Sequence, residues 1–278
     1  MTYKLIATDM DGTLSDDDFN VSKENIKAIH KALDAGIKVV LCSGRSPASL
    51  QSYEKKIGLN IEGQYGIGFN GATVYDAYTH EEIYSANRID VGLAKKIIAD
   101  AKKVNPGIPM VVNLDGNYMI ADKSLEDQIA QYDKDNSVNV ELVDELTADH
   151  ITKNVINICC IGKKESLMAI HKELSDLDKE DRVTMSFAND LMLEFLPPRI
   201  DKSVGLRNLC RHLGIEMHEI VTVGDNYNDI GMIEAAGLGI ATANAVEWLL
   251  ERADHVLKSD NNNDTMVEVV DYILKQNA

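Results

Sequence analysis

Hydrophobic and polar residues follow a repeated order near both ends of the chain: an amphipathic helix, a glycine, and then an apolar strand. Three such units occur, at Ile26–Ala35 with Ile37–Leu41, Val204–Leu213 with Glu219–Val223, and Ile230–Ala236 with Leu238–Ala241. The intervening Gly36, Gly214 and Gly237 follow the helices, where glycine supplies a left-handed cap. Apolar strands that alternate with helices predict a parallel sheet with helices on both faces.

The two ends of the chain complete the same sheet. The strand Lys4–Thr8 begins the series, and the strand Asp254–Leu257 followed by the helix Thr265–Lys275 closes it. We therefore expect both ends to build one domain, from residues 1–86 and 197–278. The predicted fold class is α/β, with a doubly wound, Rossmann-like parallel sheet as the core.

The middle of the chain, about residues 87–196, shows hairpin patterns instead. Two-residue turns at Asp115-Gly116 and Asn189-Asp190 lie between apolar runs and are typical of β-hairpins. The predicted strand pairs are Met110–Leu114 with Asn117–Ala121 and Val183–Ala188 with Leu191–Leu196. Helices are predicted at Val91–Val104, Lys123–Tyr132 and Glu165–Leu177, and a further strand at Val155–Ile161. We expect an inserted α+β domain with an antiparallel sheet.

Composition narrows the classes of function. The 278 residues include 28 Lys and Arg but 45 Asp and Glu, which gives a net charge of −17. Nucleic acids and anionic membranes recruit basic surfaces, so neither is an expected partner. The four cysteines lack metal-ligand spacing and are typical of buried thiols in a reducing compartment. With no signal-peptide core and no apolar run of ~20 residues, we expect a cytoplasmic protein.

The first strand runs into Asp9-Met10-Asp11-Gly12-Thr13, the segment with the strongest chemical signal. Side chains two residues apart on an extended segment project to the same side, so Asp9 and Asp11 can reach one reacting group together. Two adjacent carboxylates cannot both ionise freely without a cation, and one pKa is raised. Such a pair suits an acid–base residue beside an ionised nucleophile or metal ligand. Gly12 permits a sharp turn, which Thr13 can hold by a local bond.

Two other interpretations of this segment are a simple turn and a calcium loop. An Asp-Gly pair at a strand end is most often only a turn. Oxygen-bearing side chains do alternate from Asp9 to Ser15, as they do in a calcium loop. That loop requires Gly at its sixth position and Glu at its twelfth, where this chain has Leu14 and Asn20. The calcium interpretation is therefore excluded.

Polar side chains also follow two other predicted strands, and in an open α/β sheet ligands bind beyond the carboxyl ends of the strands. Ser43-Gly44-Arg45 follows one strand and leads into Ser46-Pro47, which predicts a helix start that favours an anion. Gly224-Asp225 follows another, with Asn228 and Asp229 at the start of the next helix. Lys202 heads the preceding helix, where a cation is unfavourable unless it has an anionic partner.

These segments resemble the four motifs of the haloacid dehalogenase superfamily of phosphohydrolases. Asp9-Met10-Asp11-Gly12-Thr13 is similar to the first motif, Ser43-Gly44-Arg45 to the second, Lys202 to the third, and Gly224-Asp225 with Asn228-Asp229 to the fourth. The long insert, with Asn70-Gly71-Ala72 before it and Glu194-Phe195-Leu196 at its end, resembles the cap of the Cof-like subgroup. The chain departs from the family pattern at Ser203 and Thr265, where glycine is usual, and we expect neither position to touch a reacting group.

The resemblance implies a role for each motif residue. Asp9 is the implied nucleophile, which forms an aspartyl-phosphate, and Asp11 the implied acid and base. The implied cofactor is Mg²⁺, held by Asp9, the Asp11 carbonyl and Asp225, with Asp229 behind them. The implied phosphate ligands are Ser43, Gly44, Lys202, Asn228 and the backbone N–H of Met10. The implied substrate is a small phosphorylated metabolite, with sugar phosphates as the expected class.

Two other functions stay open at this point, a phosphomutase on the same scaffold and a phosphate-receiving signalling module. The receiver module is far shorter than this chain and lacks a cap, so a phosphatase is the preferred prediction. The sequence assigns no specific substrate, specificity residue or oligomeric state. Arg45 has two open roles, a contact with the leaving group and an ion pair to the cap. Hinges between the domains are predicted near Tyr84–Arg88 and Leu196–Arg199.

Overall fold

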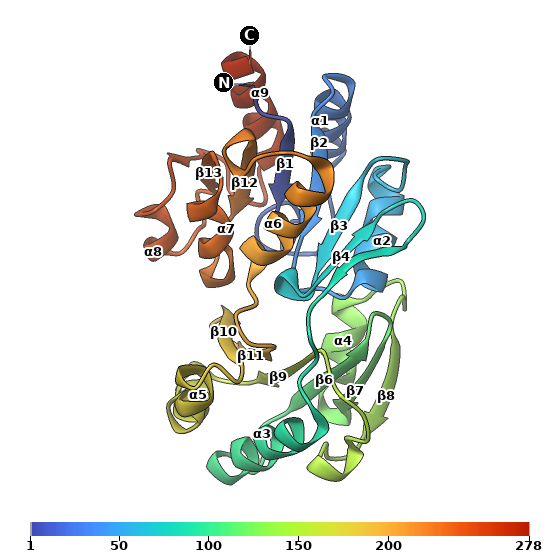
Figure 1. Cartoon of the computed structure of the whole chain (residues 1–278), viewed down its shortest axis with the longest axis vertical. Coiled ribbons are helices and arrows are strands. Elements are labelled where there is room, and N and C mark those ends of the chain that lie inside the picture. The colour runs from blue at the N-terminus through green and yellow to red at the C-terminus, as the bar shows by residue number, and fades with distance from the viewer. Residues whose placement is uncertain (1, 278) are drawn as a thin grey trace. The chain divides into compact units, whose positions relative to one another are not determined.

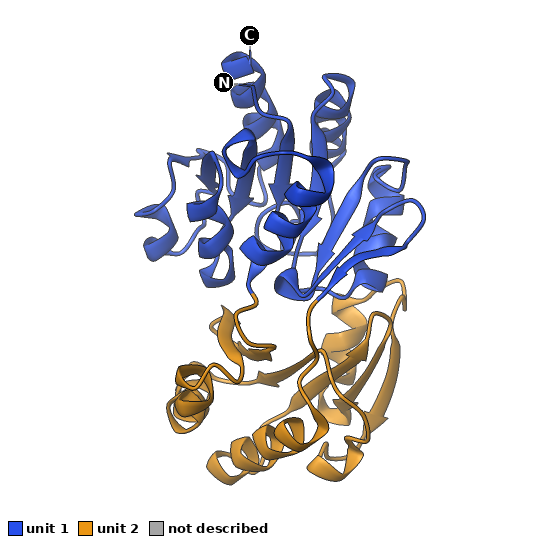
Figure 2. Ribbon diagram, viewed as in Figure 1, with its two compact units in different colours: residues 1–85, 201–278 blue, residues 86–200 orange. Residues whose placement is uncertain are grey.

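The computed structural model describes residues 2–277, which form two compact units. Unit 1 combines residues 1–85 with 201–278, and unit 2 comprises residues 86–200 (Figure 2). Unit 1 thus contains both ends of the chain, and unit 2 is a continuous insertion into it.

Unit 1 is built on an eight-stranded sheet in the order β14-β13-β12-β1-β2-β3-β4-β5. Because β1 pairs with both β2 and β12, segments from opposite ends of the sequence lie side by side at its centre (Figure 1). The strands are β1 Leu5–Thr8, β2 Lys38–Cys42, β3 Tyr65–Gly68, β4 Thr73–Asp76, β5 Glu82–Ser85, β12 Ile220–Gly224, β13 Leu238–Ala241 and β14 His255–Val256.

Helices cover both faces of this sheet. Alternate residues of β1 point to opposite faces, so that Ile6 packs in one hydrophobic cluster while Leu5 and Ala7 pack in the other. The helices of the Ile6 cluster are α1 Lys23–Asp34, α2 Pro47–Ile57 and α9 Thr265–Asn277. Those of the second cluster are α6 Lys202–Leu213, α7 Ile230–Ala235 and α8 Glu247–Leu250. The predicted doubly wound α/β fold is confirmed.

Helix ends follow the predicted signals with one exception. Ser46 caps α2, with Pro47 in the first turn, and both Gly36 and Gly214 adopt a left-handed conformation. The prediction of a left-handed cap at Gly237 is wrong, because α7 ends on the extended residue Ala236. A Cβ at Gly237 would lie 1.9 Å from the carbonyl oxygen of His218, so close backbone approach is the reason for this glycine.

The sheet of unit 1 is parallel only in part. The pairs β3–β4 and β4–β5 are antiparallel and extend one edge of the sheet. These strands were not predicted from the sequence. Gly66 and Gly68 interrupt the apolar pattern of β3, and a Cβ at Gly66 would lie 2.2 Å from the Tyr75 ring. Glycine is needed here because the backbone packs closely against its neighbours. The same glycines break the run of apolar residues from which a strand is predicted.

Unit 2 contains a six-stranded sheet in the order β10-β11-β9-β6-β7-β8. Its strands are β6 Met110–Asp115, β7 Tyr118–Asp122, β8 Asn139–Val143, β9 Asn157–Ile161, β10 Thr184–Asn189 and β11 Met192–Leu196. Both predicted hairpins are present as β6–β7 and β10–β11. The helices α3 Val91–Val104 and α5 Lys164–Lys179 pack on one face through a shared apolar cluster.

The expectation of a purely antiparallel sheet in unit 2 is wrong in one pair. β8 was not predicted, and it pairs parallel to β7. The segment predicted as one helix, Lys123–Tyr132, consists of a 3₁₀ turn at Lys123–Leu125 and the short helix α4 at Glu126–Tyr132. This long connection carries the chain back to the starting end of β7, as a parallel pair requires.

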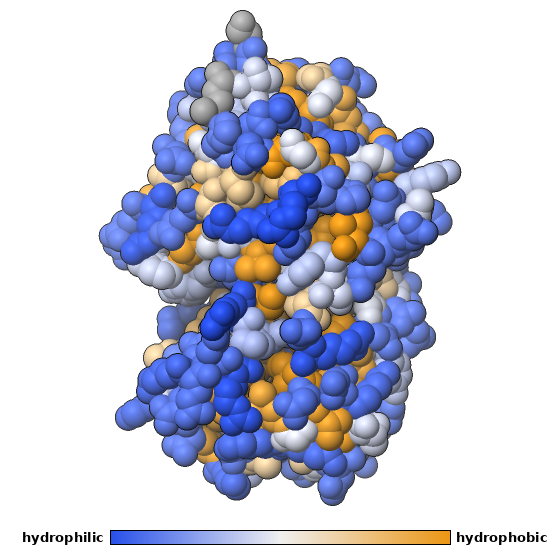
Figure 3. Space-filling model, viewed as in Figure 1, coloured by the Kyte–Doolittle hydropathy of each residue, from blue (hydrophilic) through white to orange (hydrophobic). Residues whose placement is uncertain are grey.

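Hydrophilic residues dominate the face of the molecule drawn in Figure 3, and hydrophobic residues form scattered spots among them. This polar surface agrees with the excess of acidic residues in the sequence. Across residues 2–277, none of the helices combines the length and the apolar character that crossing a membrane demands.

Candidate active site

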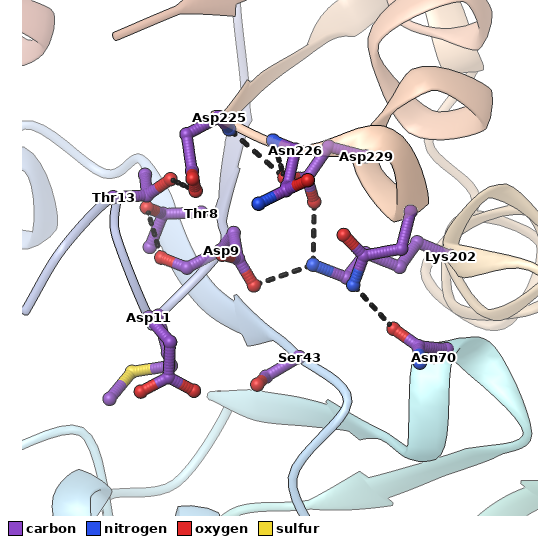
Figure 4. Close-up of polar contacts among 12 residues, drawn as sticks. Thr8, Asp9, Asp11, Thr13, Ser43, Asn70, Lys202, Asp225, Asn226 and Asp229 are labelled. Carbon is purple, nitrogen blue, oxygen red and sulfur yellow. Dashed lines mark hydrogen bonds and ion pairs between the residues drawn. The ribbon is translucent and has the colours of Figure 1, made fainter. Parts of the chain in front are cut away.

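Acidic side chains from two neighbouring strands meet at the carboxyl edge of the sheet in unit 1. Asp9 follows β1 and Asp225 follows β12, and these strands pair in parallel with Thr8 opposite Val223. Asp229 joins them from the 3₁₀ turn Tyr227–Asp229 that follows β12. One carboxylate oxygen from each of the three lies within 4.8 Å of the others (Figure 4). The first and fourth motifs therefore converge in space.

Lys202 connects two of these carboxylates. Its Nζ lies 2.5 Å from Asp9 Oδ1 and 2.5 Å from Asp229 Oδ1, and its side chain is fully buried. Lys202 is the first residue of α6. Asp201 caps the N-terminus of this helix, because its side chain accepts a hydrogen bond from the Val204 N–H. These two carboxylates, Asp9 and Asp229, offset the unfavourable position of a lysine at a helix start.

Asp229 uses both of its carboxylate oxygens within the chain. Oδ1 accepts from Lys202, and Oδ2 accepts from the backbone N–H groups of Asp225 and Asn226, each at 3.0 Å. A Cβ at Gly224 would lie 2.5 Å from the Asp229 carboxyl carbon, so only glycine fits beside it. Asp229 is thereby fixed as a support for Lys202 and for the backbone at Asp225.

Asp225 is held by the turn that follows Asp9. Thr13 makes the expected local bond through its backbone N–H, which donates to the Met10 carbonyl at 3.3 Å, and its Oγ1 donates across the site to Asp225 Oδ1 at 2.6 Å. Gly12 has a φ of +82°, and a Cβ there would lie 2.7 Å from Asp225 Oδ2. Both the turn and the close approach to Asp225 therefore require glycine at this position.

Burial and crowding perturb the ionisation of this group. Burial raises the pKa of Asp9 well above its usual range, Lys202 opposes that shift, and Asp229 and Asp225 add to it. Burial, with the Asp229 charge, raises the pKa of Asp225 to about 7. Burial alone lowers the pKa of Lys202, but the Asp229 and Asp9 carboxylates outweigh it and raise that pKa.

The site has more negative than positive charge. Three buried carboxylates surround one ammonium group, which leaves two uncompensated negative charges when all three are ionised. Buried carboxylates of this kind either hold protons or share a cation. Hard divalent cations such as Mg²⁺ prefer carboxylate and carbonyl oxygens. The donor set of Asp9, Asp225 and the adjoining backbone fits such an ion.

Asp11 forms a two-point ion pair with Arg45. Arg45 Nε donates to Oδ2 at 2.8 Å and Nη2 donates to Oδ1 at 2.6 Å. The ring centroids of Tyr53 and Phe19 lie 4.9 and 5.4 Å from the guanidinium carbon of Arg45, whose side chain is buried. In Figure 4 the Asp11 carboxylate turns away from Lys202. The structure thus gives Arg45 a partner inside unit 1, the second carboxylate of the first motif.

The expected phosphate ligands lie along the neighbouring strand ends. Ser43 follows β2, and its hydroxyl accepts from the Arg45 N–H at 3.2 Å. Asn228 Nδ2 donates to Asn70 Oδ1 at 3.0 Å, and the Asn70 N–H donates to the Ser43 carbonyl. A Cβ on Gly44 would lie 3.1 Å from Asn70 Nδ2. Asn70 therefore joins the second motif to the fourth.

All the predicted site residues lie in unit 1: Asp9, Met10, Asp11, Ser43, Gly44, Lys202, Asn228, Asp225 and Asp229. Sequence reasoning did not assign Asn70 a contact with Asn228, or Thr13 a contact with Asp225. Thr13 and Asp225 are 212 residues apart, and Asn70 and Asn228 are 158 apart. A turn residue carries no local signal of such a distant partner.

Comparisons with known proteins show which family this chain belongs to. The sequence profile of haloacid dehalogenase-like hydrolases matches residues 6–270. Over 98% of this chain and 99% of the relative, the chain is 31% identical to "Putative phosphatase YxeH" of Bacillus subtilis strain 168. It is 28% identical to 5-amino-6-(5-phospho-D-ribitylamino)uracil phosphatase YwtE of the same organism, over 94% of each chain. The crystal structure of TM0651 from Thermotoga maritima is 30% identical, with a TM-score of 0.76 over 98% of this chain and 97% of its own.

The fold is α/β, and the family match and the relatives together show a hydrolase of phosphoric monoesters. The chain belongs to the family of haloacid dehalogenase-like hydrolases, in its Cof-like branch. It is a phosphatase, and its substrates are therefore phosphorylated molecules.

Proposed function

We propose that this protein is a Mg²⁺-dependent phosphatase of small phosphorylated metabolites, sugar phosphates above all, that works through an aspartyl-phosphate on Asp9. The contact of buried Lys202 with both Asp9 and Asp229, beside Asp225, carries the proposal. A buried ammonium favours the ionised form of the attacking carboxylate. It also supplies positive charge where the oxygens of a phosphoryl group arrive.

Two carboxylates divide the chemistry. An oxygen of Asp9 forms a bond to phosphorus while the bond from phosphorus to the leaving oxygen breaks, and Asp11 gives that oxygen a proton. Asp11 then takes a proton from a water molecule that attacks phosphorus, which breaks the bond to Asp9 and releases phosphate. In the structure Arg45, braced by Tyr53 and Phe19, contacts both oxygens of Asp11, so this two-point pair must open before Asp11 carries the proton that it gives to the leaving oxygen.

The proposed Mg²⁺ ligands are Asp9, the backbone carbonyl of Asp11 and Asp225. Bound there, Mg²⁺ neutralises charge on the phosphoryl oxygens. Asp229 is not a direct ligand in this proposal, because Lys202 and two backbone N–H groups already use both of its oxygens. Its role is to orient Lys202 and the backbone at Asp225.

Polar groups from three strand ends and one helix start bind the phosphoryl oxygens in this proposal: Ser43, the Gly44 and Met10 backbone N–H groups, Asn228 and Lys202. Asn70 supports two of them, through Asn228 Nδ2 and the Ser43 carbonyl. Several donors fixed before the substrate arrives need little rearrangement in the transition state, which is where such charge stabilisation is most effective.

Residues 86–200 are proposed to act as the cap that selects the leaving group. The relative YwtE supports a phosphorylated polyol chain as one candidate substrate, since its name describes a phosphatase of a phospho-D-ribitylamino compound. Truncation of cap side chains is expected to change KM and the ranking of substrates more than it changes the dependence on Mg²⁺.

The test is phosphate release from a panel of sugar and polyol phosphates, with Mg²⁺ or with EDTA. Asp9→Asn is expected to lower kcat more than about 10³-fold, because an amide cannot attack phosphorus. Asp34→Asn, on an exposed residue of α1, is the matched control and should keep wild-type turnover. More than a tenth of wild-type kcat in Asp9→Asn contradicts the assignment of the nucleophile.

Two other outcomes identify other functions. A requirement for a bisphosphate activator, with phosphate returned to a sugar, indicates a phosphomutase. Stable phosphorylation by acetyl phosphate and Mg²⁺, without turnover, indicates a receiver module.

A further inference from the structure

The turn after Asp9 is held from outside by side chains. Its residues Gly12, Thr13, Leu14 and Ser15 are consecutive, and the carbonyl of each accepts a hydrogen bond from a side chain elsewhere in unit 1. The donors, in that order, are Asn244 Nδ2 at 2.8 Å, Thr265 Oγ1 at 2.8 Å, Asn25 Nδ2 at 3.3 Å and Asn261 Nδ2 at 3.3 Å. Three of the four donors come from the last 35 residues of the sequence.

Two of these bonds act on the residues that touch Asp225. Thr265 binds the carbonyl of Thr13, whose own hydroxyl donates to Asp225 Oδ1. Asn244 binds the carbonyl of Gly12, where a Cβ would lie 2.7 Å from Asp225 Oδ2. The same C-terminal segment reaches Asp225 a second time, because the Val246 N–H donates to the Asp225 carbonyl at 2.9 Å.

We propose that Thr265 and Asn244 are positioning residues that set the distance between Asp225 and the turn carrying Asp9 and Asp11. Neither residue touches a reacting group. Thr265 is fully buried at the first residue of α9, so its hydroxyl has a fixed direction toward Thr13. Asn244 is exposed and reaches the turn from the loop after β13.

The consequence concerns the proposed Mg²⁺ ligands, and the inference rests on that part of the proposed function. Asp9, the Asp11 carbonyl and Asp225 come from two segments more than 200 residues apart in sequence, so their spacing is set by whatever joins those segments. Mg²⁺ demands near-ideal octahedral geometry and tolerates little error in ligand spacing. Loss of the bond from Thr265 to Thr13 is therefore expected to weaken Mg²⁺ binding itself.

The test compares Thr265→Val, which keeps the shape but removes the hydroxyl, with Thr265→Ser, which keeps the hydroxyl. Binding is measured without substrate, as the rise in thermal unfolding temperature with Mg²⁺ concentration. Thr265→Val is expected to need about tenfold more Mg²⁺ for the same rise, a typical consequence of displaced supporting contacts. Thr265→Ser is expected to stay within about threefold of wild type.

Asn263→Ala is the matched control, since Asn263 is an exposed residue of the same segment whose side chain donates to Asp260. Asn244→Ala provides a second test on an exposed residue if Thr265→Val fails to fold. Equal Mg²⁺ dependence of the unfolding temperature in wild type, Thr265→Val and Asn244→Ala overturns this inference but leaves the proposed metal site standing. The inference is also overturned if Asn263→Ala weakens Mg²⁺ binding as much as Thr265→Val does. Absence of any Mg²⁺ effect on the wild-type protein overturns the proposed metal site as well.

Discussion

A buried carboxyl group outside the active site makes the stability of unit 1 depend on pH. Glu54 of α2 is 1% exposed, and Tyr75 of β4 donates its hydroxyl to Glu54 Oε1 at 2.9 Å. Glu54 Oε2 is buried with no hydrogen-bond partner within residues 2–277. Burial raises the pKa of Glu54 from its ordinary 4.5 to about 8, against the opposing effect of the Tyr75 hydrogen bond.

The direction of the pH effect follows from proton binding. Between pH 4.5 and about 8 the folded protein holds a proton on Glu54 that the unfolded chain has released, so stability falls as pH rises through this range. A pH of 7 lies 2.5 units above the pKa of Glu54 in the unfolded chain, 4.5. At about 1.4 kcal/mol per unit, the free energy of unfolding at pH 7 is therefore about 3 kcal/mol lower than at a pH below 4.5. Glu54→Gln cannot ionise, and it keeps an oxygen that can accept from Tyr75.

Urea unfolding at pH 5, 6, 7 and 8 measures this difference. The single tryptophan, Trp248 in α8, reports the unfolding of unit 1 by its fluorescence. The stability of Glu54→Gln relative to wild type is expected to rise by about 3 kcal/mol from pH 5 to pH 8. Glu62→Gln, on an exposed residue of the same unit, is the control and should follow wild type. Parallel pH curves for wild type and Glu54→Gln would refute a protonated Glu54.

Three further predictions concern the active site. Lys202→Met is expected to lower kcat by about 10³-fold or more, since Asp9 and Asp229 lose their shared counter-charge; more than a tenth of wild-type kcat contradicts this role. Asp11→Asn is expected to slow hydrolysis of alkyl phosphates more than that of p-nitrophenyl phosphate, because a proton donor matters most for a basic leaving oxygen. Equal losses in kcat for both substrates indicate a structural role for Asp11. Gly12→Ala is expected to lower both stability and turnover, whereas Gly36→Ala, at a similar φ of +79° with open space around it, lowers only stability by about 1 kcal/mol. Matching losses of kcat in these two variants would contradict the contact between Gly12 and Asp225.

Local patterns in the sequence predict the elements around the site well. The helix Val91–Val104 was predicted with the limits that it has in the structure, and Ser46-Pro47 marks the start of α2. Such features depend on residues within one or two turns of each other, as caps and apolar periodicity do. The strands β3 to β5, on one side of the sheet of unit 1, and the strand β8 were missed because glycines or polar residues weaken their apolar alternation.

The contacts that hold the site together depend on distant residues. The sequence predicted that Asp9, Lys202 and Asp225 lie at one edge of the sheet, because each follows or precedes a strand of the same series. It did not predict that Lys202 lies between Asp9 and Asp229, or that Arg45 binds Asp11. The departure at Thr265 was judged remote from the chemistry, yet its hydroxyl binds the turn after Asp9.

Two glycines explain how the insertion leaves the site of unit 1 intact. The chain leaves unit 1 after β5 and re-enters at α6, which packs on β4 and β5, so departure and return are neighbours. A Cβ at Gly71, where φ is +93°, would lie 2.1 Å from the Asp201 carbonyl oxygen, and one at Gly205 would lie 2.9 Å from Gly71 Cα. The turn that carries Asn70 thus touches the start of α6, and Lys202 enters the site directly after the insertion ends. Glycine at positions 71 and 205 is therefore a requirement for bringing the lysine to Asp9, because any side chain at either position would push α6 away from that turn.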